Sequence, residues 1–358
     1  MSDPAAVVMA PARGRSRGRG GSRREFPGGF RLVIGVAVVL VCYAEIAAWF
    51  REHDQHFAAG GVIELLIATP LLVEKDLGFA GAALLLLVAG FAIADATCGD
   101  GTARFVVRNS LRVIPLALIA TVLTWAAYGS SRRWAHAELL FAAVIMLLFA
   151  WLTFRMFRRE PWIAVAVQIT LCSVATAVIP HVAGAAASPF GASATFGLAV
   201  VLGQTCWLVH AGHVPLWAGA LLGVACWMTF VWGDRTGFGH DAGDANPLTL
   251  AYATVLMAAA VQVRAEIATG RIMSWLTSRS YPLLLTGPGV GVLVLSWLPA
   301  AVPADIRAVM AICVAGLLSD ALYRAWDLPA QRLAGWVMDV LVDRVDHVPG
   351  VEDTTRLR

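Results

Sequence analysis

The sequence predicts an all-helical protein that crosses a membrane many times. Hydrophobic residues make up 59% of the chain and charged residues only 14%, and the mean hydropathy is +0.72. Soluble domains have about 45 to 50% apolar and about 25% charged residues. A spanning helix needs about 20 apolar residues, because every backbone amide must be satisfied inside the segment. Apolar runs of this length predict a bundle of about ten spans.

The expected spans follow from these runs, with boundaries uncertain by about 2 to 4 residues. They cover residues 30–50, 78–97, 111–129, 138–157, 161–184, 192–211, 214–233, 246–265, 280–299 and 304–324. The segment 58–73 is also apolar, but it is short and contains Glu64 and Pro70. We expect it to form an outer-face or re-entrant helix rather than a span.

The charges between the runs predict the orientation. An even number of spans places both termini on the same side of the membrane. Arginines precede the first run and recur in alternate loops. The opposite loops carry acidic residues, with Arg132-Arg133 as the main exception; the acidic residues are Glu52, Asp54, Glu74, Asp76, Asp234, Asp241 and Asp244. Because cytoplasmic loops carry an excess of Lys and Arg, both termini are expected in the cytoplasm and the protein in the inner (plasma) membrane.

Three regions are expected along the chain. Residues 1–27 are rich in Arg, Gly, Ser and Ala and have too little apolar surface to fold alone. We interpret them as a disordered cytoplasmic tail whose arginines attract anionic lipid headgroups, since no nucleic-acid-reading module accompanies them. Residues 28–326 hold the spans. Residues 327–358 begin with apolar side chains at helical spacing, which predicts a cytoplasmic amphipathic helix followed by a polar tail.

The stretch 77–115 combines an apolar span with a basic segment. It contains Ala89-Gly90-Phe91, a polar loop, then Arg104, Arg108 and Arg112 before Val113-Ile114-Pro115. This order resembles the signature of the integral membrane acyltransferase type 3 family. In that family an apolar helix ends in a Ser-Gly-Phe turn, and an Arg-Arg-x-x-Arg-x-x-Pro segment follows. Ala89 stands at the position of the family's serine, and Asn109 at that of its second arginine.

Further segments keep the family's order. The first span of the family carries Arg, ten residues and His, and here Arg31 is followed at the same spacing by Cys42. Ser280-Tyr281-Pro282-Leu283 resembles the Ser-Tyr-Pro-Leu-Tyr-Leu-x-His-Pro motif, with Gly287 at the histidine position. Trp134 and the run 138–141 are similar to the family's Trp and Glu-x-x-Phe-Tyr. Tyr323-Arg324 and Asp327-Leu-Pro329 are similar to its Tyr-Arg and Glu-x-Pro ending.

This resemblance implies an O-acyltransferase. Members of the family move an acyl group from cytoplasmic acyl-CoA to a sugar, lipid or glycan at the outer face. The implied donor is therefore acyl-CoA, the implied acceptor is an envelope glycan or glycolipid, and no metal is implied. A degenerate member that acts as an accessory or scaffold protein in envelope assembly is the alternative. A transporter would be expected to show an internal repeat, and none is evident.

The basic residues are candidates for binding the donor. Arg104, Arg108 and Arg112 recur at four-residue intervals and so form one stripe at the expected cytoplasmic mouth. Guanidinium groups suit the phosphates of coenzyme A, and Arg31 is expected to assist them. Anchoring to lipid headgroups explains the same stripe equally well.

Cys42 and its neighbours are candidates for the chemistry. Arg31 and Cys42 are separated by about three helical turns, or roughly 16 Å, and share one face. A thiol is mostly protonated at neutral pH and is a poor base. Cys42 is therefore either a small packing residue or a nucleophile that takes the acyl group as a thioester, assisted by Glu45 one turn further on.

Other polar residues near the expected spans are weaker candidates. Glu138 belongs to the segment that borders the outer cavity in the family, and His136 beside it is either a relocated base or a solvated loop residue. Asp95 and Asp320 need partners or hydration, because ionisable groups inside a bilayer are costly. His210 and His213 have metal-ligand spacing, but no third ligand lies near them in the sequence.

Overall fold

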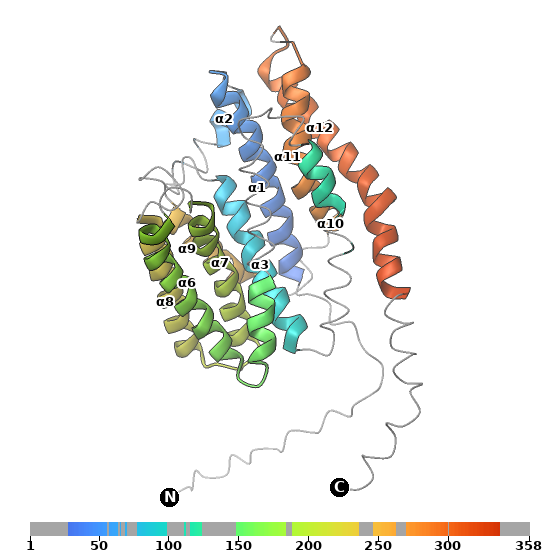
Figure 1. Ribbon diagram of the computed structural model, residues 1–358. Helices are drawn as coiled ribbons and strands as arrows, with labels where there is room; N and C mark the ends of the chain where they lie inside the picture. The colour runs from blue at the N-terminus through green and yellow to red at the C-terminus, as the bar shows by residue number, and fades with distance from the viewer. Residues whose placement is uncertain are drawn as a thin grey trace, which may run out of the picture.

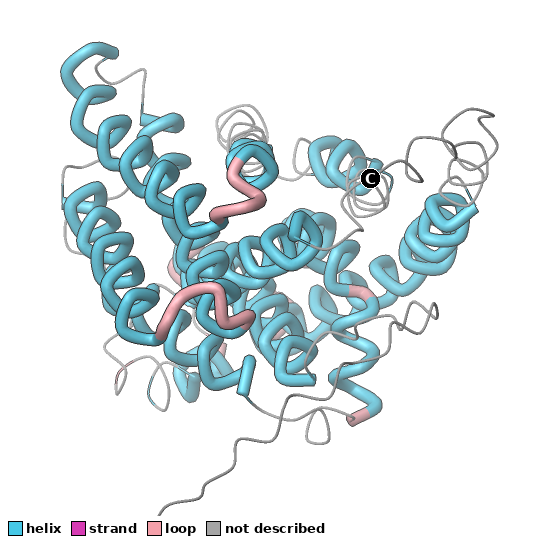
Figure 2. The backbone as a smooth tube through the Cα atoms, turned by 90° about the horizontal axis from the view of Figure 1, so that it is seen from below, coloured by secondary structure: helices cyan, strands magenta, loops and turns pink. Residues whose placement is uncertain are grey.

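The computed structural model shows a bundle of helices (Figure 1). It describes residues 28–55, 57–63, 65, 69, 77–98, 111, 115–123, 148–183, 188–235, 246–262, 270–299 and 301–336. Within these ranges there is no β-strand, and the view from below shows helices joined by loops (Figure 2). The expected all-helical fold is confirmed for this part of the chain.

The helices have the following bounds. They are α1 (Gly28–Glu52), α2 (Ala58–Ile63), α3 (Leu77–Cys98), α6 (Pro161–Ala183), α7 (Ser188–His210), α8 (Leu216–Arg235), α9 (Asn246–Gln262), α10 (Arg271–Ser278), α11 (Ser280–Trp297), α12 (Ala304–Leu322) and the π-helical turn η4 (Tyr323–Asp327). Helical stretches also cover 115–123, 148–156 and 328–336.

Six helices in the described ranges are long and apolar enough to cross a membrane. They are α1, α3, α6, α8, α11 and the continuous helix Ala304–Trp336. Two further apolar stretches, Phe196–His210 in α7 and Pro247–Gln262 in α9, are shorter. The predicted spans 111–129 and 138–157 lie only partly within the described residues. A membrane protein with several spans is therefore supported, but the count of ten is not confirmed.

Helix α1 connects two hydrophobic cores. Its first half supplies Phe30, Val33 and Ala37 to a large core with α3, α6, α7, α8 and α9. Its second half supplies Ile46, Trp49 and Phe50 to a smaller core with α11 and α12. Helix α1 is therefore shared by both cores, and it sets the position of α11 and α12 relative to the larger group of helices.

Helices α3 and α7 approach each other through glycine. A Cβ atom on Gly90 would collide with the carbonyl oxygen of Val200, and one on Gly203 would collide with that of Leu87. Small residues allow this approach between membrane helices, where packing drives association. The predicted span 78–97 corresponds to α3, which passes through Ala89–Phe91 without a turn and ends at Cys98. Gly90 therefore serves helix packing.

The segment after α1 forms a short helix at the ends of α1 and α12. The backbone N–H of Ala58 donates to Oδ1 of Asp305 at 2.7 Å, and the Tyr43 hydroxyl donates to the carbonyl of Gly60 at 3.4 Å. Only six residues of the predicted outer-face segment, Ala58–Ile63, form α2. Most of the remainder up to residue 73 lies outside the described residues.

The last helix passes through the expected domain junction. It runs from Ala304 to Trp336, and the π-helical turn Tyr323–Asp327 lies inside it. The residues predicted to begin a separate amphipathic helix at 327 thus continue the preceding helix, as far as Trp336. Leu333 and Trp336 are exposed there.

Candidate functional site

The contact between α1 and α11 brings together Cys42 and Gly287, two positions that the motif resemblance singled out. The Cys42 Sγ atom lies 3.9 Å from the carbonyl oxygen of Leu283, to which the thiol donates a hydrogen bond. A Cβ atom on Gly287 would lie 3.2 Å from the same Sγ atom. One turn further on, Gly291 packs against Ile46 in the same way. Glycines at four-residue spacing thus form the surface on which Cys42 and Ile46 rest.

Glu45 is the charged residue nearest in sequence to Cys42. Both side chains are half-buried in α1, and they lie about one helical turn apart. Among the described residues, no hydrogen bond or ion pair joins Cys42 to an imidazole or to a charged side chain of another helix. The thiol faces the backbone of α11 at Leu283 and Gly287.

Arg31 lies near the other end of α1, and its side chain is exposed. The Thr277 hydroxyl of α10 donates to the Arg31 carbonyl at 3.0 Å, which fixes α10 beside the start of α1. The Arg158 side chain donates to the carbonyl of Cys98 at 3.4 Å, at the end of α3. Because α1 and α3 pack side by side in opposite directions, these contacts lie at one end of the bundle (Figure 1). We call it the arginine-rich end.

A charged cluster joins α10, α11 and α12, and sequence analysis found only part of it. The Arg279 guanidinium pairs with Asp320, and its centre lies 5.0 Å from the Trp275 ring and 4.7 Å from the Tyr323 ring. Arg324 pairs with the second Asp320 oxygen at 2.8 Å. The sequence indicated that Asp320 needs a partner but did not identify it. The position of Arg279, directly before the Ser280-Tyr281 motif, was the one feature that could have pointed to it.

A buried arginine lies at the opposite end of the bundle. Arg307, in the first turn of α12, is 3% exposed. It donates to the side chain of Gln55, and its guanidinium carbon lies 5.7 and 5.5 Å from the rings of Trp49 and Phe50. The sequence does not single out Arg307, because it occurs alone at the edge of an apolar run. It ties the turn after α1 to α12.

The remaining polar candidates within the described residues have structural partners. Trp207 Nε1 donates to Asp95 at 3.2 Å, which connects α7 to α3. The rings of His210 and His213 lie 5.9 and 5.0 Å from Phe91 and Trp207. No group of three or more potential metal ligands occurs in the described part of the chain.

Five of the predicted site residues cannot be placed. Arg104, Arg108, Arg112, His136 and Glu138 lie outside the described residues. The geometry of the site therefore rests on Cys42, Glu45 and Arg31. In comparisons with protein-family models, curated proteins and solved structures, the chain matches none of them.

Proposed function

We propose that the chain is a ten-span plasma-membrane protein that transfers an acyl group from acyl-CoA to a glycan or glycolipid of the cell envelope. The contact between Cys42 and Gly287 carries this proposal. Two separate motif similarities, in the first and ninth predicted spans, place these residues where the acyltransferase type 3 family has histidines. Two histidines that act in one reaction must lie close together. The contact between Cys42 and Gly287 meets this requirement for the two positions.

For transfer without either histidine, we propose a covalent route through Cys42. The Sγ atom attacks the thioester carbonyl of acyl-CoA, so that a new S–acyl bond forms and the bond to coenzyme A breaks. The thiol proton leaves with coenzyme A as its free thiol. An acceptor hydroxyl then attacks the acyl-cysteine, which gives an ester and restores the Cys42 thiol. Glu45, one turn further on, accepts the hydroxyl proton and passes it to the departing sulfur.

The donor's phosphates are assigned to the arginine-rich end. Arg31 lies on the same helix as Cys42, and its exposed side chain can reach an anionic group there. The predicted stripe of Arg104, Arg108 and Arg112 is assigned to the same role, because guanidinium groups bind phosphates through paired N–H donors. In this arrangement α1 links donor binding at one end to acyl transfer at Cys42.

An accessory function without catalysis is the second candidate. It is favoured by the immediate surroundings of Cys42, where the described contacts are the Leu283 carbonyl and the backbone of Gly287. A thiol without a neighbouring cation remains protonated and is a poor nucleophile. In this alternative, Cys42 fills the space between α1 and α11, and the protein supports envelope assembly through other surfaces.

Purified protein in nanodiscs with labelled acyl-CoA separates the two candidates. Transfer through Cys42 predicts release of coenzyme A and a hydroxylamine-labile acyl mass on the peptide that contains Cys42. The Cys42→Ser variant should lose both signals, whereas Cys313→Ser should retain them because Cys313 is exposed on α12. Full transfer by Cys42→Ser would exclude the covalent route. The absence of turnover and of coenzyme A binding, together with unchanged envelope glycans in a deletion strain, would exclude the acyltransferase function and favour the accessory function.

A further inference from the structure

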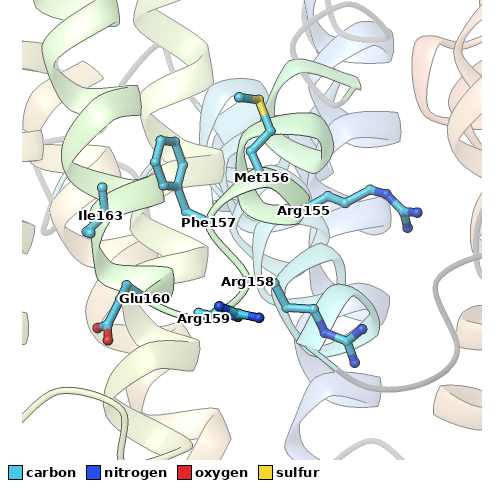
Figure 3. A pocket seen from close by; sticks show the side chains of 7 residues that line it. All are labelled: Arg155, Met156, Phe157, Arg158, Arg159, Glu160 and Ile163. Atoms are coloured by element: carbon cyan, nitrogen blue, oxygen red, sulfur yellow. The ribbon is translucent and has the colours of Figure 1, made fainter.

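The turn that joins the helical stretch 148–156 to α6 forms an open recess of about 790 Å³. It is lined by Arg155, Met156, Phe157, Arg158, Arg159, Glu160 and Ile163 (Figure 3). The volume lies within the range of about 300 to 1,000 Å³ that is common for small-molecule sites. The recess lies at the arginine-rich end, but its residues are not among those assigned above to acyl transfer or to binding the donor.

The side chains that line the recess include more arginines than carboxylates. Three arginines line it against one carboxylate, and the Glu160 carboxylate already accepts a hydrogen bond from Trp162 Nε1 at 2.9 Å. Within the described part of the chain, Arg155 and Arg159 form no ion pair. In Figure 3 the guanidinium groups of Arg155 and Arg158 lie on the opposite side of the turn from the Glu160 carboxylate. An anion can therefore approach the arginines without meeting this carboxylate.

Guanidinium groups in such a cluster favour phosphate. Each presents planar N–H donors that match phosphate oxygens, and hydrogen bonds between charged groups are stronger than neutral ones. The positive end of the α6 dipole also points toward the turn, because α6 begins at Pro161. Charge and geometry together indicate a ligand that carries a phosphate group.

Apolar side chains beside the recess indicate that the ligand also carries hydrocarbon. Met156 is 70% exposed, and Leu152 and Trp162 are 49% and 45% exposed. Further along α6, the exposed side chains of Leu171, Val174 and Val178 lie on the side of the helix that carries Ile163, which lines the recess, and not on the side of Trp162. Tryptophan is enriched where a membrane meets water. The basic recess thus lies at the start of a surface that is suited to acyl chains.

We propose that the turn 155–160 binds the phosphate of an anionic phospholipid whose acyl chains lie along α6 and the stretch 148–156. The site does not depend on acyl transfer, so it stands whether or not Cys42 is catalytic. A soluble phosphate compound, coenzyme A included, shares the phosphate but cannot use the apolar surface. This difference allows the two sources of phosphate to be distinguished.

Native mass spectrometry of the full chain in nonionic detergent tests the proposal. The protein is titrated with equal amounts of phosphatidylglycerol and phosphatidylcholine, and the bound fraction of each is measured. We expect the triple variant Arg155→Gln/Arg158→Gln/Arg159→Gln to bind phosphatidylglycerol about ten- to a hundredfold more weakly, since each arginine near a lipid surface contributes about a factor of five. The double variant Arg271→Gln/Arg332→Gln, which removes two other exposed arginines, should bind like the wild type.

Two outcomes would overturn the proposal. The first is unchanged phosphatidylglycerol binding by a folded triple variant. The second is equal binding of both lipids, together with displacement of either lipid by coenzyme A or inorganic phosphate, which would identify a site for soluble phosphate. If the triple variant does not fold, the three single Gln variants replace it, each with an expected loss of about fivefold. A triple Lys variant keeps the charge and should retain most of the lipid selectivity.

Discussion

At the scale of single residues, the space between Gly287 and Cys42 is nearly filled. A Cβ atom on Gly287 would lie 3.2 Å from the Cys42 Sγ atom, so α1 or α11 would have to shift by a few tenths of an ångström. We expect Gly287→Ala to lower the free energy of unfolding by about 1 to 3 kcal/mol. The double variant Gly287→Ala/Cys42→Ala should recover most of this loss, because the sulfur is gone.

The measurement is thermal unfolding in detergent, followed by tryptophan fluorescence. Gly335→Ala is the matched control, since nothing lies within 4 Å of a Cβ atom at that helical position. An equal loss in the single and double variants would show that the two residues do not interact.

The cluster around Arg279 gives a second prediction for single residues. The Arg279 side chain is 13% exposed, whereas that of Arg324 is 71% exposed, and both pair with Asp320. Asp320→Asn leaves the less accessible guanidinium without its anion, which costs more than the loss of an exposed pair. We expect Asp320→Asn to lower the melting temperature more than Arg324→Gln does. Equal melting temperatures would mean that water replaces the carboxylate at Arg279.

At the scale of elements, the reciprocal contacts of Gly90 and Gly203 hold α3 against α7. In each case the added methyl group would meet a backbone carbonyl, which cannot move aside as a flexible side chain can. Gly90→Ala and Gly203→Ala should therefore each lower the free energy of unfolding by about 1 to 3 kcal/mol or more. Gly223→Ala on α8 is the control, because its nearest atom would be Leu202 Cδ2 at 3.9 Å. If Gly90→Ala is as stable as Gly223→Ala, the helices are not held by glycine contact.

The same elements show what could be predicted from the sequence. Hydropathy predicted helices at most of the observed positions, because a backbone in lipid has few alternatives. It did not predict the role of Gly90, since a glycine signals either a turn or a close approach and the sequence does not say which. Arg279 and Asp320 are 41 residues apart in the sequence. No helical periodicity relates the two residues, so the sequence does not indicate that they pair. Cys42 and Gly287 were singled out only through motif similarity, and their contact emerged from the packing of α1 on α11.

At the scale of the whole molecule, the distribution of charge predicts an orientation. Arg31, Arg155 and Arg158 gather at the arginine-rich end, which the positive-inside bias assigns to the cytoplasm. The turn between α7 and α8 should lie on that side, because α7 runs parallel to α3, whereas the turn between α11 and α12 should lie outside. His213 and Ala301 are exposed residues of these two turns. Single cysteines placed there would therefore report opposite sides of the membrane.

Labelling of intact cells with a membrane-impermeant maleimide tests this orientation. The Ala301→Cys variant should react in intact cells, and His213→Cys should react only after the membrane is permeabilised. Both variants are made with Cys313→Ser to remove the exposed native thiol. The reverse pattern would place the arginines outside, away from cytoplasmic acyl-CoA, and would contradict the proposed function together with the orientation. Labelling of both positions in intact cells would place both turns outside, which three crossings by α8, α9 and α11 between them do not allow.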